Sequence, residues 1–235
     1  MENIKTAVIT GGSEGLGFAL AKHLATSGWN ILINGRNANT LSNAKKELQI
    51  FTNVIALSGD VRDEVHLIEI AETIDKKNWK INLLVNNAST LGALPMPRLL
   101  DHPVEELHKV FHTNMIAPVS LLQKLNPFLA SGATIVNISS DAGVEAYENW
   151  GAYGSSKAGL DHLTAILAKE YPELHFYAFD PGDMRTRMHQ DAFPGEDISD
   201  RPLPEEKALP ALMQLIETNY PSGRYTTSIL KEEII

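Results

Sequence analysis

The sequence predicts an α/β fold: a doubly wound parallel sheet of seven strands with helices on both faces. Short apolar runs alternate with segments of helical period along the whole chain, which is the pattern of strands joined by covering helices. Several of these runs are continuously apolar, as strands buried on both faces should be. A glycine-rich turn follows the first run directly and separates it from the first helical segment.

The expected strands are short and spread over the chain. We place them at Ile4–Thr10, Asn30–Gly35, Asn53–Leu57, Ile81–Asn86, Thr134–Ser139, His175–Asp180 and Arg224–Ile229. Between the first two, the apolar residues Leu16, Leu20 and Leu24 recur at helix spacing. The same spacing predicts a long helix over Ala152–Glu170 and a short one at about Pro204–Glu217.

Length and composition indicate one globular unit. Open α/β sheets often reach 235 residues as one domain, so a single domain spanning residues 1–235 is expected. The chain has no cysteine, which excludes disulfides, zinc–thiolate sites and cysteine nucleophiles. We expect no metal site, and we expect the protein to be cytoplasmic.

Charge and hydropathy exclude two classes of partner. The formal net charge of −9, without any run of Lys or Arg, argues against the phosphate-neutralising surface of nucleic-acid binders. The first residues lead straight into an apolar strand and lack the features of a signal peptide. No segment has about 18 uninterrupted apolar residues, so we expect no membrane span.

The stretch 183–206 differs in composition from the rest of the chain. Proline, acidic residues, arginine and methionine crowd it without periodicity. Such a long loop inside a compact domain is usually functional or mobile. We expect it to form a lid over a substrate pocket, because lids of this kind set specificity. Its His189 is expected to be solvated, with a substrate contact as the alternative.

The segment Thr10–Gly17 reads TGGSEGLG and lies between the first strand and the first helix. Glycines at such a turn let backbone N–H groups approach a pyrophosphate at the helix N-terminus. The spacing Gly11-x-x-x-Gly15-x-Gly17 differs from the common G-x-G-x-x-G fingerprint, and turn chemistry alone is the alternative explanation. Its position in a βαβ unit favours a Rossmann-like dinucleotide site.

The end of the second strand indicates which dinucleotide binds. A carboxylate about 20 residues after the glycine turn would bind the ribose of NAD, whereas an arginine there accepts the 2′-phosphate of NADP. The chain has Arg36 and Asn37 at this place and no acidic residue. NADP(H) is therefore the expected cofactor, with NAD(H) as the alternative and a solvated Arg36 as the competing explanation. Glu14 in the glycine turn weakens the case for NADP(H).

Three polar side chains form a candidate acid–base group. Tyr153 and Lys157 are four residues apart in a helical segment, so both project from one face. An adjacent ammonium and an oxidised nicotinamide ring would both favour the phenolate of a tyrosine, whose ordinary pKa is near 10. Ser140 lies thirteen residues before Tyr153, at the carboxyl end of a predicted strand. Ligands of open parallel sheets bind beyond these strand ends, where the glycine turn also lies.

With these motifs in order, the chain resembles the short-chain dehydrogenase/reductase family over nearly its whole length. The family's glycine turn is matched by Thr10–Gly17, and its Tyr-x-x-x-Lys by Tyr153 and Lys157. The remaining matches are Asp60 with Val61, Asn86-Asn87-Ala88 with Ser89 in place of a glycine, Asn114, Ser140, and Pro181-Gly182 with Thr186.

The resemblance implies hydride transfer between NADP(H) and a small carbonyl or alcohol substrate, such as a ketone, an aldehyde or a pterin-like carbonyl. It implies that Tyr153 exchanges the proton and that Ser140 holds the substrate oxygen. Lys157 would stabilise the phenolate and hold the nicotinamide ribose. The backbone of Asn114 would help to hold a water that links Lys157 to solvent.

The resemblance also implies the residues of the site. The expected catalytic residues are Asn114, Ser140, Tyr153 and Lys157. The expected cofactor-binding residues are Gly11, Ser13, Glu14, Gly15, Leu16, Gly17, Arg36, Asn37, Asp60, Val61, Asn87, Ala88, Tyr153, Lys157, Pro181, Gly182, Met184 and Thr186.

Other interpretations stay open at this point. A non-catalytic NADP(H)-binding regulator on the same fold is the main alternative, because fold does not dictate activity. Tyr147 is a rival phenol, but it has no lysine four residues on, and we expect it to be a pocket or packing aromatic. The family resemblance implies a homodimer or homotetramer, and the chain ending favours the dimer.

Overall fold

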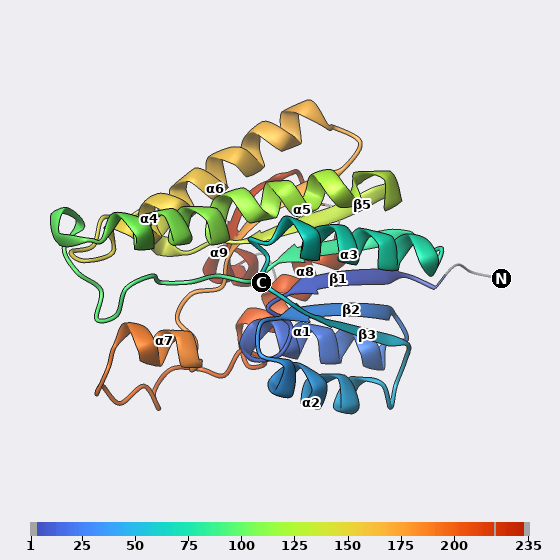
Figure 1. The fold of residues 1–235 in the computed structure, drawn as a ribbon, viewed down its shortest axis with the longest axis horizontal. Helices are drawn as coiled ribbons and strands as arrows, with labels where there is room; N and C mark the ends of the chain where they lie inside the picture. The colour runs from blue at the N-terminus through green and yellow to red at the C-terminus, as the bar shows by residue number, and fades with distance from the viewer. Residues whose placement is uncertain (1–3, 219, 233–235) are drawn as a thin grey trace.

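Over residues 4–218 and 220–232, which the computed structural model describes, seven parallel strands form one sheet in the order β3-β2-β1-β4-β5-β6-β7 (Figure 1). The strands are β1 (Thr6–Thr10), β2 (Asn30–Gly35), β3 (Val54–Ser58), β4 (Ile81–Asn86), β5 (Leu129–Ile138), β6 (His175–Asp180) and β7 (Gly223–Thr226). The predicted doubly wound α/β fold is confirmed. The expected absence of a signal peptide concerns the start of the chain, and residues 1–3 lie outside the described part.

The helices cover both faces of the sheet (Figure 1). One layer holds α1 (Gly15–Thr26), α2 (Ala38–Leu48), α8 (Ala208–Glu217) and α9 (Thr227–Glu232). The other holds α3 (Glu64–Lys76), α4 (Val104–Phe111), the π-helix η2 (His112–Ile116), α5 (Ala117–Leu125) and α6 (Gly151–Glu170). Three short 3₁₀ turns are η1 (Leu99–Asp101), η3 (Asn126–Phe128) and η4 (Asp141–Gly143). The short helix α7 (Arg187–Ala192) lies beyond one edge of the layers.

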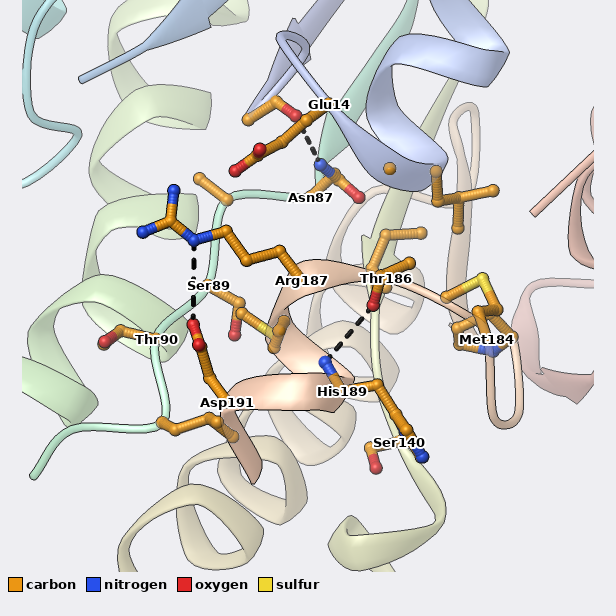
Figure 2. A pocket seen from close by; sticks show the side chains of 18 of the residues that line it. Glu14, Asn87, Ser89, Thr90, Ser140, Met184, Thr186, Arg187, His189 and Asp191 are labelled. Atoms are coloured by element: carbon orange, nitrogen blue, oxygen red, sulfur yellow. Dashed lines mark hydrogen bonds and ion pairs between the residues drawn. The ribbon is translucent and has the colours of Figure 1, made fainter. Parts of the chain in front are cut away.

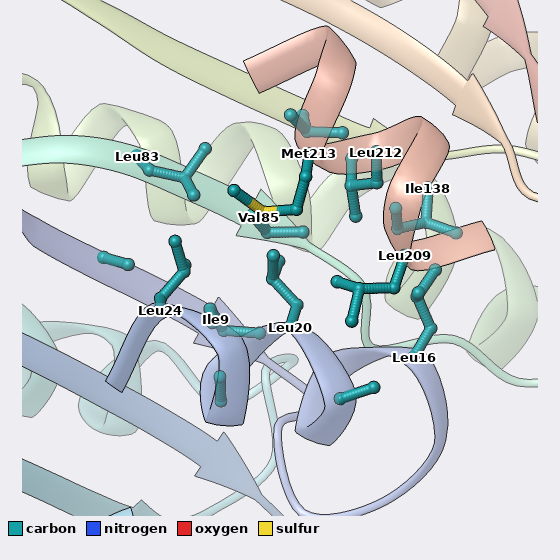
Figure 3. Packing of buried hydrophobic residues seen from close by; sticks show 14 of the residues in the cluster. Ile9, Leu16, Leu20, Leu24, Leu83, Val85, Ile138, Leu209, Leu212 and Met213 are labelled. Atoms are coloured by element: carbon teal, nitrogen blue, oxygen red, sulfur yellow. The ribbon is translucent and has the colours of Figure 1, made fainter. Parts of the chain in front are cut away.

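Two apolar cores hold these layers to the sheet, because successive side chains of a strand face opposite sides. On one face, Ile9 of β1 and Val85 of β4 pack against Leu20 of α1 and against Leu212 and Met213 of α8 (Figure 3). Full burial of each such side chain contributes roughly 1.5–3 kcal/mol. This packing fixes the first helix with its N-terminal turn at the carboxyl end of β1.

The opposite core fixes the second helical layer. Val8 and Leu84 of the sheet pack against Ile70 of α3 and against Leu121 and Leu125 of α5. No described helix is both long and apolar enough to cross a membrane.

The last predicted strand, Arg224–Ile229, is wrong in its second half. The strand β7 ends at Thr226, and Thr227 begins helix α9. The Thr226 hydroxyl accepts a hydrogen bond from the Ile229 amide at 3.2 Å, which caps the first turn of a helix rather than continuing a strand. Apolar residues at the chain end suit either element.

Two further boundaries differ from the expectation by four or five residues. β5 begins at Leu129, five residues before the predicted Thr134, and its early part includes exposed residues around Gly132, which hid the strand from an apolar pattern. α8 begins at Ala208 rather than at Pro204, because Pro204 lies in the turn before the helix. The Pro204 carbonyl accepts a hydrogen bond from the Leu209 amide.

Candidate active site

A cleft of about 870 Å³ opens where the strands β1 to β6 end. The segments that follow these strands all contribute to its lining, as expected for a ligand site in a doubly wound sheet. All of the predicted site residues line it except Gly17 and Asn114. A Cβ on Gly17 would lie 2.4 Å from the Gly11 carbonyl oxygen, so this glycine serves the close packing beneath the turn.

The glycine turn has the geometry of an anion site. Gly11 and Gly15 have φ values of +62° and +58°, which L side chains rarely adopt. The side-chain amide of Asn87 donates to the Gly11 carbonyl at 2.9 Å and thereby holds the turn in this conformation. Glu14, the N-cap residue of α1, makes no side-chain bond to the first-turn amides, which remain available for a pyrophosphate.

Arg36, Asn37 and Asp60 line the end of the cleft that lies next to β2 and β3. Arg36 lines the cleft, is exposed, and forms no direct ion pair with another described residue. Asn37 also lines it, but its side-chain oxygen caps α2 by accepting bonds from the Asn39 and Thr40 amides. Arg62 Nη2 lies 2.7 Å from Asp60 Oδ2, and hydrogen bonding from Arg62 lowers the pKa of this carboxyl.

Ser140 lies two residues after the end of β5, where it caps the turn η4, and it lines the cleft. Its hydroxyl donates to Asp141 Oδ1 at 2.9 Å and accepts from the Ala142 amide at 3.2 Å. The other carboxylate oxygen of Asp141 accepts a bond from the rival phenol Tyr147 at 3.0 Å. Tyr147 packs against Trp150 and does not line the cleft, in agreement with a packing role.

Tyr153 projects from α6 into the cleft and is 7% exposed. Burial raises the pKa of its phenol to about 12, and hydrogen bonding with Ser140 and Ser89 opposes this rise. Burial thus favours the protonated phenol, and stabilisation of the phenolate by Lys157 stays a prediction. Desolvation outweighs the favourable contacts, and the phenol keeps its proton.

Lys157 lies one helical turn after Tyr153 and is 1% exposed. Its Nζ donates to the Ile138 carbonyl at 2.7 Å and lies 5.4 Å from the centre of the Tyr153 ring. Burial lowers the pKa of this lysine to about 8, against the opposing effect of the Asp161 carboxylate. The ammonium can therefore lose its proton within a working pH range.

Asn114 lies in the π-helix behind the cleft and is 1% exposed. Its Oδ1 accepts bonds from the Ser89 hydroxyl at 3.1 Å and the Thr90 amide at 2.9 Å. Its Nδ2 donates to the Thr90 carbonyl at 2.9 Å and to Ser156 Oγ at 3.0 Å. The amide thus joins the segment after β4 to the helix that carries Tyr153, and all four of its hydrogen-bonding positions are filled.

Replacing Asn114 by alanine is expected to lower the free energy of unfolding by at least about 2 kcal/mol, because several buried polar groups lose their partner. Urea denaturation measures this change. The matched change Asn39→Ala, at an exposed position of α2, should cost little. Equal stability losses in the two variants would contradict the structural account of Asn114.

Segment 183–206 contains the helix α7 and lies beside the glycine turn (Figure 2). Thr186 caps α7 by accepting the His189 amide at 3.3 Å, and its methyl lies 3.6 Å from where a Cβ of Gly15 would be. Arg187 and Asp191 extend from α7 into the cleft, and Arg187 Nε lies 3.9 Å from Asp191 Oδ2.

His189 is not the solvated loop residue that the sequence suggested. Its side chain is 11% exposed, and its ring packs on Phe193 at 4.9 Å. It lines the cleft as part of segment 183–206, and the ring contact with Phe193 helps to shield it from solvent. A helix of six residues in a stretch without apolar periodicity gave no signal for this packing.

An apolar cluster forms part of the cleft wall beside Tyr153. Leu91, Trp150 and Met188 pack with Tyr153 in one small cluster, and Trp150 meets the tyrosine ring edge-on at 5.6 Å. The sequence analysis missed the contribution of Trp150, although this residue lies one helical turn before Tyr153. Ser89 was noted only as a departure from a motif, yet it bridges Asn114 and Tyr153. Within the described residues, no three His, Asp or Glu side chains are grouped to hold a metal ion.

Comparison with known families decides what this arrangement is. A model of the family described as short chain dehydrogenase matches residues 5–197. The chain belongs to this family. The match spans the glycine turn, the Asn87 segment and the group formed by Ser140, Tyr153 and Lys157.

Individual relatives of this short-chain dehydrogenase agree in fold and length. It is 31% identical over 193 residues to the rhamnolipids biosynthesis 3-oxoacyl-[acyl-carrier-protein] reductase of Pseudomonas aeruginosa, covering 78% of this chain and 74% of the relative. It is 29% identical to the NADPH-dependent pterin aldehyde reductase of Arabidopsis thaliana, covering 90% and 88%. The structure of the Pseudomonas aeruginosa RhlG/NADP active-site complex superposes with a TM-score of 0.83 at 26% identity, covering 96% and 95%.

Proposed function

We propose that this short-chain dehydrogenase is an NADP(H)-dependent carbonyl reductase that acts on small ketones, aldehydes or pterin-like carbonyls. The observation that carries this proposal is the meeting of Ser140, Tyr153 and Lys157 in the same cleft as the uncapped glycine turn. The relatives named as reductases, one of them NADPH-dependent, support it.

In the proposed reaction a bound reduced nicotinamide supplies a hydride to the carbonyl carbon. Ser140 redirects its hydroxyl from Asp141 to the substrate oxygen and orients it. Tyr153, held in its neutral form by burial, donates its proton to the same oxygen. The Lys157 ammonium lies beside the phenol and stabilises the phenolate that remains.

Preference for NADP(H) over NAD(H) is proposed from the end of β2. Gly35 stands there where a carboxylate would repel a 2′-phosphate, and a Cβ at this position would approach Ser13 Oγ to 3.2 Å. Arg36 follows with a free guanidinium that can grip a phosphate bidentately. The NADP complex of the structural relative agrees with this choice.

Arg36→Ala is expected to raise the KM for NADPH roughly tenfold or more, because a charge-assisted hydrogen bond to phosphate contributes about 1.5–3 kcal/mol. The KM for NADH should change little. Steady-state assays with both cofactors measure the two values, and Arg98→Ala, which removes an exposed arginine paired with Glu148, is the control. A proportional rise for both cofactors would contradict the assignment.

The function itself is tested by a screen of the purified protein. Loss of NADPH absorbance is followed with a panel of aldehydes, ketones and pterins, each with and without protein. The apolar wall around Trp150 and Met188 leads us to expect turnover with carbonyls that carry an apolar or aromatic group. Absence of turnover with every member of the panel would refute the proposal.

Three further features are proposed on the same basis. We infer that the chain forms one domain, that segment 183–206 closes over the substrate as a lid, and that the protein is a homodimer. Contact of Thr186 with the glycine turn supports a lid that responds to cofactor. Light scattering of the purified protein measures the oligomeric state.

A further inference from the structure

Arg224 on β7 contacts the back of the candidate catalytic group. Its Nη2 donates to the Ser140 backbone carbonyl at 3.0 Å and to Asp180 Oδ2 at 3.0 Å. Its Nε donates to Asp161 Oδ2 at 2.9 Å. The guanidinium side chain is 29% exposed, and the Asp161 and Asp180 side chains are 15% and 9% exposed. One cation thus ties the end of β5 to α6 and β6.

The two carboxylates bound by Arg224 act on the two acid–base residues. Asp161 lies one helical turn after Lys157 on α6, and its charge raises the pKa of that lysine. Asp180 is the last residue of β6, and its charge raises the pKa of Tyr153. Two shielded negative charges therefore face the proton donor and its neighbour, and Arg224 compensates both.

We propose that Arg224 is a positioning residue that fixes the Ser140 peptide and compensates the charges of Asp161 and Asp180 behind the acid–base group. Arginine suits this role because its planar fork serves three acceptors at fixed angles, whereas an ammonium is a point donor. The inference rests on the proposed carbonyl reduction, in which Ser140 and Tyr153 act on the substrate oxygen.

The expected direction of the electrostatic effect follows from the charges around the group. Asp161 faces Lys157, while Asp180 and Asp141 face Tyr153. Removing the Arg224 cation leaves two of these three carboxylates uncompensated. Negative charge stabilises an ammonium and destabilises a phenolate, so the pKa values of both Lys157 and Tyr153 should rise.

The test uses the whole protein and two readouts. In Arg224→Gln, we expect kcat for carbonyl reduction to fall roughly tenfold or more, because the Ser140 carbonyl loses its anchor. The Lys157 pKa is followed by NMR of ¹³Cε-labelled lysine, with the signal assigned by its absence in Lys157→Met. It should rise by about half a unit or more, and this readout requires no turnover.

Two more variants separate charge from geometry. Arg224→Lys keeps the cation but not the fork, so kcat should fall while the Lys157 titration stays near that of the wild type. Arg224→Gln combined with Asp161→Asn removes one charge of each sign. This pair should bring the Lys157 titration back toward the wild-type value, and it avoids the uncompensated buried Asp161 if the single variant folds poorly.

Lys124→Gln, which removes an exposed cation paired with Glu64, is the control and should change neither readout. The inference is overturned if Arg224→Gln retains both wild-type kcat and the wild-type Lys157 titration, even with a lower melting temperature. If the wild type reduces no carbonyl, the proposed function fails. The lysine titration then still decides whether Arg224 tunes the group.

Discussion

Tyr153→Phe is expected to lower kcat for carbonyl reduction by roughly 10²- to 10⁴-fold, the usual contribution of a general acid. The phenol carries a proton across the whole working range, since burial raises its pKa to about 12. Phenylalanine retains the packing against Trp150 and removes only the hydroxyl. The binding of NADPH, measured by fluorescence titration, should therefore be close to that of the wild type.

The matched control is Tyr171→Phe, at the end of the same helix, where the ring is 40% exposed. Its activity should remain within about twofold of the wild type. A Tyr153→Phe variant that keeps more than a few per cent of turnover with cofactor binding intact would remove the tyrosine from the role of proton donor.

The sequence predicted the group around Tyr153 because spacing and strand ends are local features. Ser140 lies two residues after the carboxyl end of β5, and an interval of thirteen residues leads to Tyr153 on the following helix, so topology brings them to one edge of the sheet. The partners of Ser140 on its other side were invisible. Arg224 reaches it only because β7 pairs with β6, with Arg224 opposite Ala178, and no local pattern announces that register.

Two features cannot be predicted from local patterns: the burial of side chains and the cap of the last helix. No local pattern reports how far Tyr153 is removed from water, and this burial raises the pKa of its phenol. His189 was assigned to solvent because its six-residue helix has no apolar period, whereas Phe193 shields it. The composition of residues 227–229 suits either a strand or a helix. The hydrogen bond from the Ile229 amide to the Thr226 hydroxyl favours the helix.

The largest pH effect is expected from Lys157. Burial lowers the pKa of its ammonium from 10.5 to about 8, so the charge is present below that pH and lost above it. Tyr153 remains protonated through this range and cannot cause the same change. We therefore expect kcat/KM for NADPH, which reports the free protein, to fall above about pH 8 with the loss of one proton.

Lys157→Met should remove this pH dependence and lower kcat/KM roughly 10²-fold or more at neutral pH, because the phenolate loses its stabilising charge. The measurement is kcat/KM for NADPH from about pH 6 to pH 10, the range that brackets the lowered and the ordinary lysine pKa. Lys169→Met, which removes an exposed lysine from the same helix, should keep the wild-type profile. If Lys157→Met shows the same fall above pH 8 as the wild type, the titrating group is another residue, because methionine carries no proton to lose.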